Sequence, residues 1–155
     1  MNQLLHVSAS PHIKDRVTTS SIMLDVIIAL IPATLFGIIQ FKINALLIIV
    51  TTITTCVLAE YLYERFMKKT ITIKDLSAVV TGFILALNLP STVPLWLPVI
   101  GGLFAIIVVK QFYGGLGQNF MNPALAARCF LLISFTGRMT NFVFDGMTSS
   151  TPLAI

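Results

Sequence analysis

Charged side chains are scarce in this sequence. Asp, Glu, Lys and Arg make up 10% of its 155 residues, against about 25% in soluble domains. Hydrophobic residues make up 56%, and the mean hydropathy is +0.93. These values exclude a soluble globular domain and indicate an integral membrane protein. The apolar stretches are continuous rather than alternating, so we expect membrane helices and not the strands of a barrel.

Residues that hold metals or act as nucleophiles are equally few. The two cysteines, Cys56 and Cys129, lie in apolar runs without CxxC spacing. Because iron–sulfur clusters and structural zinc need four ligands, the cysteines cannot hold either alone, and we expect them to be small buried apolar residues. No Ser–His–acid arrangement supports hydrolytic chemistry. The start of the chain also lacks the basic-then-apolar pattern of a secretory signal.

The first half of the chain predicts a helical hairpin. Apolar runs at residues 21–40 and 43–62 are each about as long as a membrane span. The link of Phe41 and Lys42 is short, so the two helices should be antiparallel.

The second half is less regular. Residues 76–89 and 95–110 are short apolar runs separated by Pro90 and Pro94. They predict broken or re-entrant helices or, with equal weight, two ordinary tilted helices. A last helix should begin at Asn122, because asparagine suits an N-cap and the following proline suits the first helical position, and it should end near residue 135. The expected fold is an all-α polytopic membrane protein with about five transmembrane or broken helices.

Basic residues predict the orientation of these helices. Six of the ten fall in the lead at residues 14–16 and in the loop at residues 65–74. The positive-inside rule then places the N-terminus in the cytoplasm, in a multi-pass arrangement. We expect a polar cytoplasmic lead at residues 1–20, a helical membrane domain at 21–135, and an extracytoplasmic segment at 136–155.

That last segment contains the hydroxyl-rich sequence DGMTSSTPL at residues 145–153. One reason for such a sequence beside membrane helices is a hydroxyl offered to a cofactor phosphate. The glycine-rich link at residues 114–117 leads into the Asn122 helix start, which could present free N–H groups to an anion. Arg128 should point into the protein or a wet cavity and pair with an acid, a helix C-terminus or a cofactor. Asp25 and Glu60 are acids within apolar runs, and either an ion path or an interfacial position explains them.

Three blocks together resemble a known family: LPSTVPLW at residues 89–96, VKQFYGGLGQN at 109–119 and NPALAAR at 122–128. They are similar to the D subunit of Rnf complexes, which couple ferredoxin and NAD oxidoreduction to ion translocation. The B subunit of the sodium-pumping NADH:quinone reductase has a related pattern. The resemblance spans nearly the whole chain and implies a location in a bacterial or archaeal inner membrane. Family members are about twice as long and consist of two related halves, so we expect this chain to be the N-terminal half of a two-repeat fold.

The resemblance implies a flavin site. In the family a threonine carries FMN through a phosphoester bond, in a motif that Asp145, Gly146, Thr148 and Thr151 match, so Thr151 is implied as the FMN-bearing residue. Ser150 stands where the family pattern usually has alanine and adds a neighbouring hydroxyl. The other residues expected to shape flavin binding are Arg128, Asn122, Gly115 and Gly117.

A second, non-covalent flavin such as riboflavin is expected by analogy with the quinone-reductase relative. The implied function is a membrane subunit of an ion-translocating ferredoxin:NAD oxidoreductase that relays electrons coupled to Na⁺ or H⁺ transport and is not catalytic alone. Expected partners are the other membrane and extracytoplasmic flavin subunits, a flavin transferase and the lipid bilayer, without nucleic acid. The alternatives are a solute or ion transporter or channel without a redox cofactor, and a membrane scaffold for redox partners.

Overall fold

The computed structural model describes residues 18–69, 71–144 and 147–149. Its helical body consists of α1 (Thr19–Phe66), α2 (Ser77–Leu87), α3 (Trp96–Leu103), the π-helix η2 (Phe104–Gln111) and α4 (Pro123–Ser134). The 3₁₀ turn η1 (Ile73–Asp75) precedes α2, and the single turn α5 (Thr136–Met139) follows α4. Strands β1 (Phe142–Phe144) and β2 (Met147–Ser149) pair as a small antiparallel hairpin beside this body. The all-α membrane fold is therefore confirmed, with this hairpin as an addition that the sequence did not predict.

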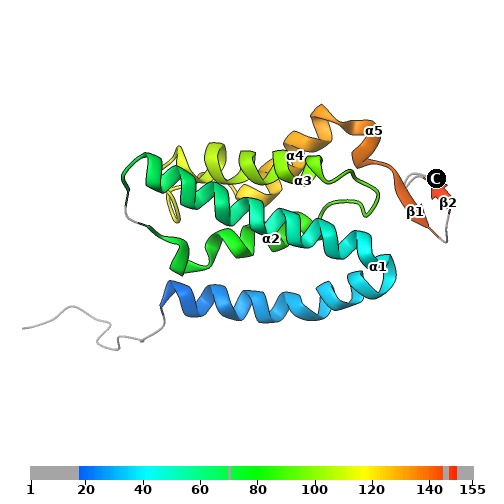
Figure 1. Ribbon diagram of the computed structural model, residues 1–155, viewed down its shortest axis with the longest axis horizontal. Helices are drawn as coiled ribbons and strands as arrows, with labels where there is room; N and C mark the ends of the chain where they lie inside the picture. The colour runs from blue at the N-terminus through cyan, green and yellow to red at the C-terminus, as the bar shows by residue number, and fades with distance from the viewer. Residues whose placement is uncertain (1–17, 70, 145–146, 150–155) are drawn as a thin grey trace, which may run out of the picture.

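Helix α1 is a hairpin of two arms. Lys42 has φ 56° and ψ −136°, which interrupts the helical backbone inside α1. Figure 1 shows the chain reversing there, so that residues 19–41 and 43–66 run in opposite directions. Each arm is long enough to cross the apolar part of a membrane. The predicted hairpin and its link at Phe41 and Lys42 are thus confirmed.

The later helices are short, as the proline-rich breaks predict. Helix α2 ends before Asn88, and α3 continues directly into η2, so that residues 96–111 form one apolar helical stretch. Helix α4 begins after Asn122, whose side-chain oxygen accepts hydrogen bonds from the N–H groups of Ala124 and Leu125 at 3.0 and 3.4 Å. The predicted N-cap is confirmed.

Small residues let these helices approach closely. A Cβ added to Gly82 on α2 would lie 2.8 Å from the Cα of Ile53 on α1, and one added to Gly101 on α3 would lie 2.7 Å from the Leu131 side chain on α4. Helices in membranes associate through such small residues because close backbone contact increases van der Waals attraction. The core of the described residues accordingly joins the second arm of α1 to α2, α3 and α4.

The two cysteines differ in their surroundings. Cys56 is buried in the core between α1 and η2, as predicted. Cys129 is exposed on α4, so the prediction that both cysteines are buried is wrong for this one. An apolar run in a membrane helix has a face turned away from the core, and Cys129 lies on that face.

Candidate functional site

The residues predicted to bind flavin are only partly covered by the structure. Thr151, Asp145, Gly146 and Ser150 lie outside the described residues. Thr148 belongs to strand β2, where it pairs with Val143. The covalent attachment segment therefore stays a prediction from the sequence.

Arg128 does not point into the protein as expected. It is exposed on α4, and its Nη1 donates a hydrogen bond of 2.9 Å to Oδ1 of Asn88. Asn88 is the C-cap of α2, so the side chain is at a helix C-terminus, which was one of the predicted pairings. Arg128 is exposed within the described residues, so its contact with a wet cavity or a cofactor stays a prediction.

The glycine-rich link is also less open than expected. Gly114, Gly115 and Gly117 have φ of 113°, 99° and 85°, which favours glycine over residues with a Cβ. The N–H of Gly114 bonds to the Gln111 carbonyl at 3.3 Å, and that of Gly115 bonds to the Lys110 carbonyl at 3.0 Å. Since Asn122 also occupies two amides of α4, most of the donors predicted for an anion are already bonded. The link instead terminates η2, because its N–H groups bond to the last carbonyl groups of that helix.

The end of η2 lies among a set of buried polar residues that were not predicted to be close to one another. We call Glu60, Glu64, Thr72, Ser77, Lys110 and Gln111 the buried acid cluster. They come from the second arm of α1, the segment before η1, the start of α2 and the end of η2. Apart from the half-buried Thr72, each is at most 5% exposed.

Lys110 is the cationic centre of the buried acid cluster. Its Nζ lies 2.5 Å from Oε1 of Glu60 and 2.6 Å from Oγ of Ser77. The contact with Glu60 is the one ion pair among the described residues. Glu60 was predicted to be either in an ion path or merely interfacial. Its side chain is fully buried within the helical body, and its place in an ion path stays a prediction. Asp25, the other acid considered, is exposed on the first arm of α1.

Glu64 is held in the same cluster by the chain around it. Its Oε2 accepts the N–H of Thr72 at 3.0 Å, and its Oε1 contacts the hydroxyl of Thr72. Gln111 Nε2 lies 3.3 Å from Oε1 of both Glu60 and Glu64. Two acids four residues apart on a helix share one face and repel each other. This spacing is the signal that could have predicted a shared cationic partner.

Two cavities lie against the buried acid cluster. One of about 480 Å³, which we call the lysine cavity, is lined on its polar side by Ser77, Lys110, Asn119 and Asn122 and otherwise mainly by apolar side chains such as Met23 and Ile84. The other, of about 300 Å³, we call the loop cavity. It is lined by Glu64, Lys69, Thr72, Asp75, Gln111 and residues 114–116. Of the predicted flavin-pocket residues, Asn122 lines the lysine cavity and Gly115 lines the loop cavity, whereas Gly117 and Arg128 line neither.

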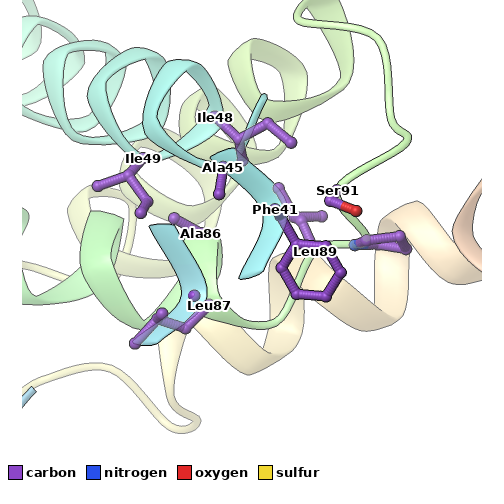
Figure 2. Close-up of a pocket in the computed structure, with 10 residues that line it drawn as sticks. Phe41, Ala45, Ile48, Ile49, Ala86, Leu87, Leu89 and Ser91 are labelled. Atoms are coloured by element: carbon purple, nitrogen blue, oxygen red, sulfur yellow. The ribbon is translucent and has the colours of Figure 1, made fainter. Parts of the chain in front are cut away.

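A third cavity, of about 240 Å³, has a different character. It lies where the bend of α1 meets the break after α2, and Figure 2 shows Phe41, Leu89 and Ser91 close together at this place. Its remaining lining comes mainly from apolar side chains, including Ala45, Ile48 and Ile49. It offers hydrocarbon surface and few polar groups, so we assign it no role in binding a charged ligand.

With this geometry established, comparisons with known proteins decide the family. The NQR2, RnfD, RnfE family model matches residues 6–155. The chain belongs to that family. It is 49% identical over 160 aligned positions to the D subunit of the Na(+)-translocating ferredoxin:NAD(+) oxidoreductase complex of Acetobacterium woodii, and the match covers 100% of this chain and 50% of the relative.

Other members of the family extend this result. The D subunit of the proton-translocating ferredoxin:NAD(+) oxidoreductase complex of Clostridium ljungdahlii is 41% identical, with 96% of this chain and 47% of the relative covered. The D subunit of the ion-translocating oxidoreductase complex of Shewanella denitrificans is 42% identical, with 88% and 40% covered. The predicted resemblance to the D subunit of Rnf complexes is confirmed, and the chain spans about half the length of the curated relatives it matches.

Proposed function

We propose that this chain is part of a membrane subunit of an ion-translocating ferredoxin:NAD⁺ oxidoreductase, and that the subunit carries FMN covalently on Thr151. The observation that supports this most directly is the 49% identity to the Acetobacterium woodii protein across the whole chain. The membrane helices and the sequence motif around Thr151 agree with it. The names of the Acetobacterium and Clostridium relatives state different cations, so family membership alone does not specify the transported ion.

We propose the lysine cavity as the site of a second, non-covalent flavin. The cavity combines apolar walls with the polar groups of Lys110, Asn119 and Asn122, and its size is within the usual range of small-molecule sites, about 300–1,000 Å³. Apolar walls suit the faces of an isoalloxazine ring, and the polar side chains suit its edge. When bound, a flavin supplies one- and two-electron chemistry, while the protein supplies position and electrostatic environment.

Fluorescence of the denatured subunit tests the covalent flavin. The full-length subunit, produced together with an active flavin transferase, is separated on a denaturing gel and viewed under ultraviolet light beside a Thr151→Val variant. A fluorescent band that disappears in the variant is the expected result, because valine keeps the shape of threonine without the hydroxyl. A band that persists moves the attachment to a neighbouring hydroxyl such as that of Ser150.

Absence of any fluorescent band in the wild type would refute the covalent flavin. Transport of an ion or solute without a bound chromophore would then favour the transporter alternative. Because denaturation releases a non-covalent flavin, the same gel does not report on the lysine cavity. That flavin is measured separately, by its absorbance in the supernatant after acid precipitation.

A further inference from the structure

We propose that Glu60 and Glu64 share one exchangeable proton, and that the hydroxyl of Thr72 relays it between them. The role of this proton in ion transport rests on the function proposed above. The proton itself is inferred from the buried acid cluster alone.

The first argument is charge balance. Glu60 and Glu64 are 0% and 2% exposed, and Lys110, also 2% exposed, is the single cation in contact with them among the described residues. Two carboxylates and one ammonium leave one negative charge without a partner. A buried charge without compensation is strongly unfavourable, so a carboxyl in this setting takes up a proton or a second cation.

The second argument is a count of hydrogens. The Oγ of Thr72 contacts Oε1 of Glu60 at 3.3 Å and also contacts Oε1 of Glu64. A hydroxyl has one hydrogen and cannot donate to both carboxylates. If Glu64 is protonated, it donates to Thr72, and Thr72 donates to Glu60. Both contacts then become hydrogen bonds.

The third argument is an unpartnered atom. Oε2 of Glu60 is buried and accepts no hydrogen bond within the described part of the chain. Buried polar atoms without a partner are rare in native structures. Oε2 of Glu60 therefore has no donor that balances its share of the charge, and this favours a neutral carboxyl in the pair over two carboxylates.

Donor groups around the two carboxyls favour a proton over a metal ion. The Nζ of Lys110 and the Nε2 of Gln111 both approach Oε1 of Glu60, at 2.5 and 3.3 Å. Hydrogens that converge on this oxygen repel a metal cation, whereas a proton on Glu64 uses the contact that Glu64 already makes with the Thr72 hydroxyl. Among the described residues, other titratable groups near the pair include Cys56, one turn before Glu60 on α1, and Lys69 and Asp75, which line the loop cavity.

The proposed relay moves a proton and no electrons. The proton leaves Oε1 of Glu64 for Oγ of Thr72, while the hydroxyl hydrogen of Thr72 passes to Glu60. Glu64 becomes a carboxylate and Glu60 a neutral acid, so the total charge is unchanged. Glu64 and Thr72 line the loop cavity, which gives the proton a polar route to this side of the cluster, while Lys110 and Ser77 line the lysine cavity.

Infrared difference spectroscopy of the purified complex, comparing the spectra in H₂O and in D₂O, tests the proposal. The signal is the carbonyl stretch of a protonated carboxylic acid, which is identified by its shift in D₂O. The wild type should show one such band from this pair. Glu60→Gln and Glu64→Gln should each lose it, because Lys110 then balances the remaining carboxylate. Asp25→Asn, at an exposed acid, is the matched control and should leave the band unchanged.

Substitutions of Thr72 test the relay. Thr72→Val should keep the band but shift it, because the protonated acid loses its acceptor, and Thr72→Ser should restore the wild-type position. Thr52→Val is the control, since Thr52 is fully buried and its hydroxyl donates to the Ile48 carbonyl of its own helix, at 2.6 Å.

Three results would overturn the proposal: no protonated-acid band in the wild type, a band that survives both glutamine substitutions, or a band that disappears when choline chloride is replaced by NaCl. The last result would identify the occupant as a sodium ion. None of these readings depends on the flavin, so loss of the proposed covalent FMN would leave this test unaffected.

Discussion

The ion pair of Lys110 and Glu60 gives the sharpest stability prediction. Lys110→Met removes the ammonium and keeps most of the side chain's apolar length. Glu60 and Ser77 lose their shared donor, and two buried carboxyls remain with no cation in contact among the described residues. Removing one partner of a buried ion pair costs about 3–5 kcal/mol, because the other charge stays buried without compensation.

The geometry of the pair explains why this value should exceed that of a surface pair. Exposed ion pairs contribute about 0–1 kcal/mol, since water already solvates both charges. Here the lysine and glutamate side chains are 3% and 0% exposed.

A double-mutant cycle in mixed micelles measures this effect. The free energy of unfolding is obtained from SDS titration of the purified subunit for the wild type, Lys110→Met, Glu60→Gln and the double variant. The double variant should recover about 0.5–3 kcal/mol relative to the sum of the single variants, which is typical of residues in direct contact. Lys74→Met, at an exposed lysine, is the control and should change stability by about 0.5 kcal/mol at most. A cost below about 1 kcal/mol for Lys110→Met would refute the argument, because the pair would then behave as a solvated one.

Two further substitutions test helix packing and capping. Gly82→Ala places a Cβ 2.8 Å from the Ile53 backbone, and this overpacked contact should cost about 1–3 kcal/mol of unfolding free energy. A Cβ at Gly37 meets nothing within 4 Å, so the control Gly37→Ala should be neutral or stabilising. Equal effects of the two variants in the same SDS titration would contradict the close approach of α1 and α2. Asn122→Ala removes the cap of α4 and should lower the free energy of unfolding by about 1 kcal/mol, whereas Asn122→Asp keeps an acceptor oxygen and should retain most of the stability. A loss of stability in both variants would show that Asn122 acts through its amide nitrogen and not through the cap.

The helices were predictable because their signals are local. A short link of Phe41 and Lys42 between two apolar runs predicts a hairpin, and the break at Lys42 lies at this link. The cap at Asn122 depends on residues within one turn, and the structure has it as predicted. Continuous apolar runs and proline breaks likewise determine where α2 and α3 begin and end.

The buried acid cluster was not predictable in the same way, because its contacts join distant parts of the chain. Lys110 and Glu60 are separated by 50 positions, and Gln111 and Glu64 by 47. In the sequence, Glu64 stands beside basic and aromatic residues that suit a membrane interface. Its burial results from the segment before η1 folding back over α1, where Thr72 covers both acids.

The winding of η2 connects the glycine-rich link to this cluster. Lys110 and Gln111 are consecutive, yet both side chains reach Glu60. In a π-helix the bonds run from residue i to i+5, and this wider winding brings consecutive side chains nearer to one face than an α-helix does. The N–H of Phe112 bonds to the Ile107 carbonyl, and that of Gly115 to the Lys110 carbonyl, so the wide winding extends into the link.

A residue with a Cβ at position 115 would strain this ending, since φ there is 99°. The block VKQFYGGLGQN that identifies the family in sequence therefore has a structural purpose of its own. It terminates η2, and this places the Lys110 ammonium and the Gln111 amide against the two buried acids of the cluster.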